Sequence, residues 1–164
     1  MLVSADLFVE YTTVLGSCIA ACLFDPDARL GGMNHFLLAE PTAGMPADAV
    51  DEHHGIYLMD ALVNEMISQG ASRQRLRAHL YGGANLHTGM KRIGAINAGF
   101  ARAFLAREQI TLLHEEVGGD KARLIYFRPA LGRVRCQTVA DCPSEHMFSL
   151  PSRHRGAGSA AQIN

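Results

Sequence analysis

The sequence predicts an α/β domain in which mixed β sheets form a sandwich and two helices pack on the outside. Several short segments are rich in β-branched and aromatic residues, and glycine or proline clusters separate them. Two longer segments instead repeat apolar residues at intervals of three and four, which is typical of amphipathic helices. The predicted order is three strands, a helix, a strand, a helix and three more strands.

The first part of the chain is predicted to form three strands. Residues 7–24 are apolar and rich in strand-forming types, and a break at Gly16-Ser17 divides them into two strands. Asp25-Pro26-Asp27 is typical of a turn, because proline fixes φ and aspartate side chains bond nearby amides. Residues 33–38 then complete a β-hairpin, and residues 40–51, which contain glycine and two prolines, are expected to form a loop.

Helical spacing predicts two helices further along the chain. The first begins near His54 and ends at Gly70. Its apolar face is formed by Ile56, Met59, Leu62, Val63, Met66 and Ile67. The second is expected to share one apolar face among Ile93, Ile96, Phe100, Ala103 and Phe104, with Arg102 and Arg107 opposite.

Four further strands and one domain boundary complete the predicted organisation. The strands are expected at residues 76–81, 110–113, 123–127 and 133–139, the last with one solvated face. Gly118-Gly119 is interpreted as a hairpin turn. Residues 1–151 are predicted to form a single domain, and residues 152–164, which lack periodicity, a disordered tail.

The amino-acid composition argues against several classes of protein. The 164 residues include 15 Lys and Arg against 16 Asp and Glu, a net charge of −1 that argues against nucleic-acid binding. Residues 11–24, the longest uncharged stretch, are too few to span a membrane, so no membrane insertion is expected. The first basic residue is Arg29, which argues against a signal peptide. A cytoplasmic location is therefore expected.

The four cysteines fit a reducing compartment better than a disulfide scaffold. Their spacing contains no Cys-x-x-Cys pair, so a structural zinc site is not expected. Cys18 follows Gly16-Ser17 at a break between strands, where backbone amides can favour a thiolate and an oxyanion. The alternative is that Cys18 is a small buried hydrophobic residue. Cys22 and Cys136 are assigned to packing, and Cys142 to a loop.

His35 is the candidate proton acceptor for Cys18. It lies among apolar strand residues, where a structural, hydrogen-bonded histidine is the alternative. The predicted hairpin brings His35 close to Cys22 and within reach of the turn that carries Cys18. The glycine-rich segment 82–91 lacks the spacing of a phosphate-binding loop, because Met90 separates Gly89 from the lysine. A tight turn before a helix is favoured there, with a weak anion or carboxamide contact as the alternative.

Several motifs together resemble the chemoreceptor glutamine deamidase (CheD) family. The most specific is Leu-Gly-Ser-Cys at 15–18, followed by Gly-Gly-Met-Asn-His at 31–35. Further matches are Tyr57, residues 60–62, residues 81–84, Ile93-Gly94 with Asn97, residues 117–119 with Arg123, and residues 132–134. The resemblance covers roughly residues 7 to 139.

This resemblance implies a cysteine amidase with a catalytic triad. In that family the cysteine is the nucleophile and the histidine the base, which fall on Cys18 and His35. A threonine supports the pair, and an ungapped count places it at Thr12, with Thr13 as the alternative. The implied fold is similar to that of bacterial deamidating toxins, and no metal or organic cofactor is implied.

The implied reaction converts glutamines of methyl-accepting chemotaxis receptors to glutamate and releases ammonia. Two other functions remain open. The chain could be a non-catalytic adaptor that binds receptors or a CheC-type response-regulator phosphatase. It could also be a thiol hydrolase of another class, such as a peptidase or a receptor methylesterase.

Overall fold

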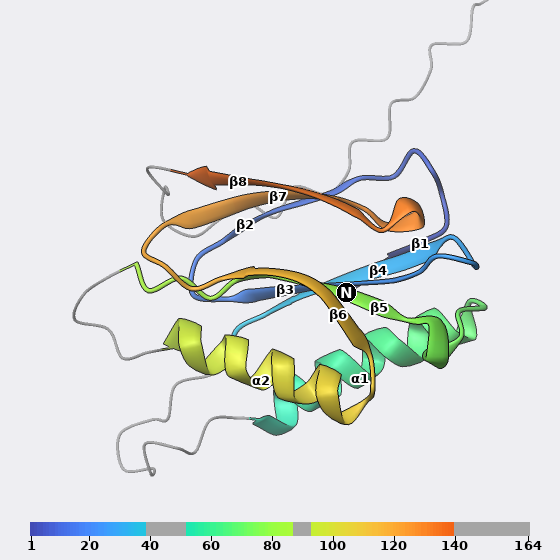
Figure 1. The fold of residues 1–164 in the computed structure, drawn as a ribbon, viewed down its shortest axis with the longest axis horizontal. Coiled ribbons are helices and arrows are strands. Elements are labelled where there is room, and N and C mark those ends of the chain that lie inside the picture. The colour runs from blue at the N-terminus through green and yellow to red at the C-terminus, as the bar shows by residue number, and fades with distance from the viewer. Residues whose placement is uncertain (39–51, 87–92, 140–164) are drawn as a thin grey trace, which may run out of the picture.

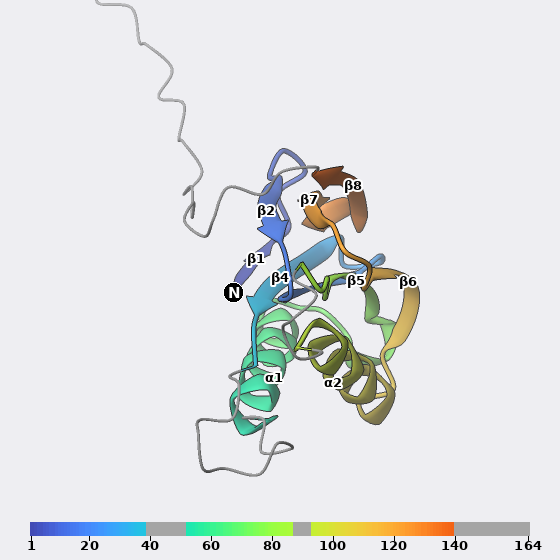
Figure 2. The ribbon, with the colours of Figure 1, turned by 90° about the vertical axis from the view of Figure 1, so that its left-hand side faces the viewer.

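In a computed structural model, the chain forms three layers. The structure describes residues 1–38, 52–86 and 93–139. A five-stranded sheet lies in the middle, a three-stranded sheet covers one of its faces, and two helices cover the other (Figures 1 and 2). This arrangement confirms the predicted α/β class with mixed sheets and external helices. The predicted tail, the loop at 40–51 and Cys142 lie outside the described residues.

The middle sheet has the strand order β1-β4-β3-β5-β6. Its strands are β1 (Leu2–Ser4), β3 (Ile19–Asp25), β4 (Leu30–Phe36), β5 (Arg77–Gly82) and β6 (Thr111–Val117). All pairs are antiparallel except β5–β6, which is parallel and joined by a helical crossover. The short strand β1 was not predicted.

The outer sheet has the order β2-β7-β8, and both of its pairs are antiparallel. Its strands are β2 (Tyr11–Leu15), β7 (Ala122–Arg128) and β8 (Arg133–Val139). The predicted hairpin at Gly118-Gly119 is therefore wrong. These glycines, both with positive φ, carry the chain from β6 in the middle sheet to β7 in the outer sheet.

The helices are α1 (Glu52–Ser68) and α2 (Ile93–Arg107), close to the predicted bounds. The apolar face predicted for α2 is confirmed for Phe104, which is buried, and for Phe100, which packs against the core, but it is wrong for Ile96 and Ala103, which are exposed. Its buried residues are Gly94, Asn97, Ala98, Ala101, Phe104 and Leu105, whereas Ile96 is exposed. Small side chains face the sheet because α2 approaches it closely, and the larger Ile96 and Phe100 line a groove towards α1 with Ile56.

Strand β3 is buried along its whole length because both faces of the middle sheet are covered. Ile19, Ala21 and Leu23 pack in the core beneath the helices. Ala20 and Cys22 point the other way, into a smaller core between the two sheets. This second core leads directly to the candidate site.

Candidate active site

Cys18 lies in the bend that connects the two sheets. Gly16, Ser17 and Cys18 form this bend, with β2 before it in the outer sheet and β3 after it in the middle sheet. Cys18 is partly exposed, and its side chain packs against the smaller core. The structure thus places a thiol at the edge of an apolar interior.

The glycine-rich turn after β5 holds this bend through main-chain hydrogen bonds. The amide of Gly83 donates to the Cys18 carbonyl at 2.7 Å, and the amide of Ala84 donates to the Gly16 carbonyl at 2.8 Å. A third amide, that of Asn85, donates to the Gly119 carbonyl. These three amides are occupied within the fold, as expected for a structural turn, and residues 87–92 of the segment lie outside the described residues.

Gly82 is required at this turn by both its conformation and its surroundings. Its φ is +110°, and a Cβ atom at this position would lie 2.1 Å from the Cys18 carbonyl oxygen. Any side chain here would therefore displace the backbone of Cys18. The sequence motif Tyr-Gly-Gly-Ala at 81–84 is thus part of the support for Cys18.

His35 lies on β4, on the face that points towards the outer sheet. It pairs with Ala20, and Cys22 pairs with Met33, so His35 and Cys22 are diagonal neighbours on the same face, close together as the hairpin predicts. Ala20, the partner of His35, is two residues after Cys18, so this register places His35 beside the bend that carries Cys18.

Thr13, on β2, supports His35 from the outer sheet. Its Oγ1 lies 3.1 Å from Nδ1 of His35. Thr12 is the preceding residue on the same strand, so its side chain points to the opposite face, where it is exposed. The structure therefore brings Thr13, the alternative from the sequence, to His35 and leaves Thr12 away from it.

The environment of His35 favours the neutral imidazole. Burial lowers the pKa of His35 below its usual 6.5, and the positive charge of the amino terminus lowers it further. When Nδ1 donates to the Thr13 hydroxyl, Nε2 carries a lone pair that can accept a proton. The site thus contains a base that is uncharged near neutral pH.

Asn97 and Gly94 belong to the family motif at the start of α2, and each contacts the segments around Cys18. Asn97 is completely buried on α2, and its Nδ2 donates to the Ser17 carbonyl at 2.9 Å. One turn earlier, a Cβ atom at Gly94 would lie 2.2 Å from the Gly83 carbonyl oxygen. The missing side chain lets α2 approach the glycine-rich turn closely enough for Asn97 to reach the bend.

The other described cysteines differ from Cys18 in their surroundings. Cys22 is fully buried, and burial strongly raises the pKa of its thiol. Burial and the nearby Glu116 carboxylate raise the pKa of Cys136 to about 11. Both were assigned to packing from the sequence, and their positions in or against the smaller core confirm this. A raised pKa disfavours the thiolate, which is the reactive form.

The acidic, histidine and cysteine side chains do not gather into a metal site within the described chain. Residues 1–38, 52–86 and 93–139 contain no group of three or more His, Cys, Asp or Glu side chains that could hold a metal ion. Within the same ranges, neither helix has the length and apolar character needed to cross a membrane.

A thiol, an imidazole and a hydroxyl that bonds to the imidazole lie where the two sheets join, and such groups are used in nucleophilic catalysis by cysteine. The fold and this arrangement together define an α/β domain with a candidate cysteine–histidine site. The family model described as "CheD chemotactic sensory transduction" matches residues 37–138, and the chain belongs to the CheD family.

Several relatives cover most of the chain, and each carries the name "Probable chemoreceptor glutamine deamidase CheD". The protein of Zymomonas mobilis is 49% identical over 152 residues, which are 92% of this chain and 83% of the relative. That of Caulobacter vibrioides is 49% identical over 139 residues, 84% of this chain and 73% of the relative. The Agrobacterium fabrum protein is 41% identical over 151 residues, 92% of this chain and 82% of the relative.

Proposed function

We propose that this protein is a cysteine-dependent glutamine deamidase that acts on methyl-accepting chemotaxis receptors, with Cys18 as nucleophile. The observation that supports the proposal is that His35 bonds to Thr13 and pairs with Ala20, two residues after Cys18, at the junction of the two sheets. The names of the relatives supply the substrate class. A cytoplasmic location, which keeps thiols reduced, fits this chemistry.

The first half of the reaction forms a thioester. Neutral His35 takes the proton of the Cys18 thiol, and the thiolate attacks the side-chain carboxamide carbon of a receptor glutamine. Amides of the bend at 16–18 are the expected donors to the resulting oxyanion. The protonated His35 then gives its proton to the leaving nitrogen, and ammonia departs as the carbon–nitrogen bond breaks.

The second half hydrolyses the thioester. His35, neutral again, takes a proton from water, and the hydroxide attacks the acyl carbon. The carbon–sulfur bond breaks and Cys18 recovers its proton. The net change is one glutamine and one water converted to glutamate and ammonia, so each turnover adds one negative charge to the receptor.

Thr13 gives His35 a defined orientation during both halves. A hydroxyl at Nδ1 holds the ring plane and selects the tautomer whose Nε2 can accept the proton of the thiol. Thr13 therefore replaces Thr12 in the proposed triad. Because Thr13 belongs to the outer sheet and His35 to the middle sheet, the base is held from both layers.

Mass spectrometry of receptor cytoplasmic fragments tests the proposal. Wild-type protein is expected to release ammonia and convert specific glutamines to glutamate without shortening the fragment, whereas Cys18→Ala is expected to do neither. Cys22→Ala is the matched control, because Cys22 lies in the core, and it is expected to keep its turnover. Substantial ammonia release by Cys18→Ala would contradict the assignment of the nucleophile.

The same receptor fragments also distinguish a deamidase from an adaptor, a peptidase and a methylesterase. An adaptor would bind the receptor fragment and leave its glutamines unchanged, and a peptidase would shorten it. A methylesterase would release methanol from a methylated receptor. Binding to a CheC-type phosphatase stays a prediction, which a pull-down with the purified pair would test.

A further inference from the structure

Asn97 connects the bend that carries Cys18 with the end of the strand that carries His35. Its Nδ2 donates to the carbonyl of Ser17 at 2.9 Å, and its Oδ1 accepts the amide of Leu38 at 2.9 Å. Ser17 directly precedes Cys18, and Leu38 is three residues after His35. One side chain from α2 thus bonds to both segments.

The bond to Ser17 fixes the peptide plane next to the nucleophile. The peptide between Ser17 and Cys18 is trans, as are all described peptide bonds, so its atoms lie close to one plane. Holding the carbonyl oxygen of that plane therefore also sets the direction in which the chain enters Cys18. On the other side of Cys18, its carbonyl is held by the Gly83 amide at 2.7 Å. Both peptide groups that flank the thiol are fixed.

The choice of residue also points to a role beyond packing. Asparagine is a weak helix former, and its buried amide is costly unless both ends are hydrogen-bonded. Neighbouring buried positions on α2 carry alanine, which needs no partners. A polar residue that departs from the local pattern and is fully satisfied by two catalytic segments is typical of a functional position.

We propose that Asn97 is a positioning residue, which holds Cys18 in line with His35 and the target carboxamide. This inference rests on the proposed use of Cys18 as nucleophile. It assigns Asn97 no contact with substrate and no proton transfer. Loss of the bond to Ser17 lets the bend relax, so the thiol spends less time at the attack geometry.

The decisive variants are Asn97→Ala, which removes both bonds, and Asn97→Asp, which keeps the acceptor for Leu38. An ionised carboxylate at this site cannot donate to the Ser17 carbonyl. We expect kcat for receptor-fragment deamidation to fall about ten- to a hundred-fold in both, since small misplacement of a reacting group has effects of this size. KM is expected to stay close to the wild-type value, because Asn97 is fully buried.

The pH profile of Asn97→Asp gives a readout that a purely structural role would not move. Burial raises the pKa of the introduced carboxyl, and its protonated form can donate to Ser17 again. The ratio of variant to wild-type kcat should therefore rise as the pH is lowered, in Asn97→Asp but not in Asn97→Ala. The rate of Cys18 alkylation by iodoacetamide should be reduced in both variants at neutral pH.

Leu105→Ala is the matched control for lost stability. Leu105 is buried on the same helix and packs in the core beneath it, away from the bend. We expect this variant to lower Tm while leaving kcat and the alkylation rate unchanged below its transition. Wild-type kcat and alkylation in the Asn97 variants would overturn the inference, as would an equal loss of kcat in Leu105→Ala. Activity in Cys18→Ala would instead overturn the proposed function.

Discussion

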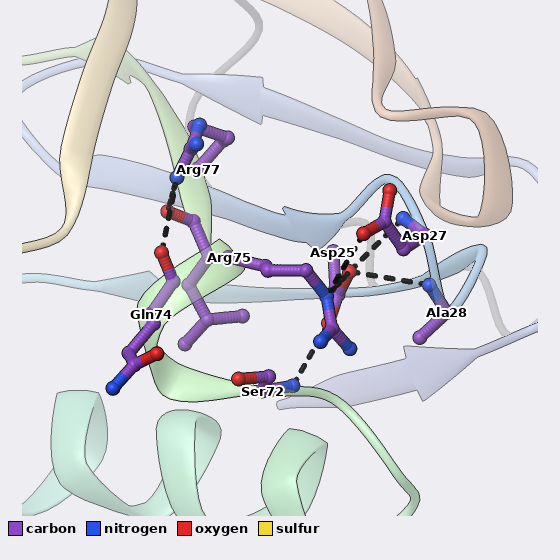
Figure 3. Close-up of polar contacts among 8 residues, drawn as sticks. Asp25, Asp27, Ala28, Ser72, Gln74, Arg75 and Arg77 are labelled. Carbon is purple, nitrogen blue, oxygen red and sulfur yellow. Dashed lines mark hydrogen bonds and ion pairs between the residues drawn. The ribbon is translucent and has the colours of Figure 1, made fainter.

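The two ends of the β3–β4 hairpin are built from different kinds of groups. At the closed end, the carboxylate of Asp25 has no exposed surface and accepts five hydrogen bonds (Figure 3). Their donors are the amides of Asp27, Ala28 and Ser72 and the Nε and Nη2 atoms of Arg75. At the open end, the polar groups are Thr13, which bonds to His35, and Asn97, which bonds to the bend that carries Cys18.

Along this pair of strands, the groups that stabilise the fold lie at the closed end, and the groups proposed for the reaction lie at the open end. A charge that is surrounded by donors stabilises the fold but is a poor general acid or base, because its protonation is suppressed. The lowered pKa of His35 instead keeps its imidazole neutral near neutral pH. The neutral ring adds no ion pair to the fold, but it can accept a proton. We infer that the closed end anchors the hairpin so that the open end can hold reactive groups.

Removal of His35 is expected to have the largest effect on activity. His35→Ala removes the base for both halves of the reaction and should lower kcat about a hundred- to ten-thousand-fold. Its Tm should change little, because the open end contributes reactivity more than stability. His53→Ala, an exposed histidine on α1, is the control and should match wild type. A normal turnover number in His35→Ala would contradict the proposed base.

The pH profile of the wild-type enzyme tests the same residue without a mutation. His35 must be neutral to take the proton of Cys18, and burial lowers its pKa below 6.5. The acid limb of kcat/KM is therefore expected below pH 6.5, where an exposed histidine would already be half protonated. An acid limb well above that value would show that another group controls the reaction.

Loss of Asp25 is expected to have the next largest effect, and on stability. Asp25→Ala leaves three amides without their acceptor and should lower the free energy of unfolding by about 2–4 kcal/mol. Turnover by the folded protein should be unchanged, as measured well below Tm. Asp27→Ala is the control, because Asp27 is largely exposed and makes only an outer contact with Arg75 at 3.3 Å. An equal loss in both variants would mean that exposed charge, and not the buried cluster, stabilises the turn.

Asp25 also predicts how stability depends on acid. Although burial alone would raise its pKa, the hydrogen bonds from Arg75 and the three amides lower it to about 2, against 3.8 for the unperturbed group. A lowered pKa in the folded state means that this stabilisation is present above pH 3.8 and is lost as the pH falls towards 2. Chemical unfolding from about pH 5 to about pH 2 should show this loss in wild type and a weaker one in Asp25→Ala.

Gly82→Ala tests whether the glycine-rich turn positions the nucleophile. Its Cβ would meet the Cys18 carbonyl, so we expect kcat to fall about ten-fold or more as the bend shifts. Gly70→Ala is a matched control, because Gly70 has a similar φ of +106° and no atom lies within 4 Å of the position that a Cβ would take there. Both variants carry the same backbone strain, and only Gly82→Ala should lose turnover. Equal kcat in the two would show that the clash at Cys18 is harmless.

Some of this contrast was predictable from the sequence and some was not. The sequence offered Cys18 and His35 as candidates, because a cysteine after Gly-Ser at a strand break and a histidine on the next strand are local features, and the family resemblance assigned their roles, which stay predictions. The role of Asp25 was predicted only as far as the turn. Its contacts with Ser72 and Arg75 join residues about fifty positions apart, and no local pattern indicates them.

The buried face of α2 shows a second limit. Large apolar side chains usually mark the buried face, so Ile96 and Phe100 were expected to face the sheet. Near its start the helix instead packs through Gly94, Ala98 and Ala101, where it approaches the glycine-rich turn closely, and only further along do Phe104 and Leu105 enter the core. Local hydrophobicity is a poor guide to the buried face where the helix backbone lies close to another segment, because small side chains are then the ones that fit.

Substitutions of Thr12 and Thr13 are expected to have the smallest effect on activity, and they distinguish between two adjacent positions on β2. Successive residues of a strand point to opposite faces, so a shift of one position separates Thr13 at His35 from Thr12 in solvent. An ungapped count from the cysteine cannot resolve this shift, because it cannot show where β2 ends and the bend begins. Thr13→Ala should lower kcat several-fold, of the order of one lost hydrogen bond of about 1 kcal/mol.

Thr12→Ala should leave kcat unchanged, and Thr13→Ser should restore most of the activity lost in Thr13→Ala, because the hydroxyl is retained. The pH profile distinguishes support of the base from packing. Without the Thr13 hydroxyl the acid limb of kcat/KM should move, since the bond at Nδ1 of His35 is lost. A loss of activity in Thr12→Ala, with Thr13→Ala unaffected, would reverse the assignment and place the threonine on the other face of β2.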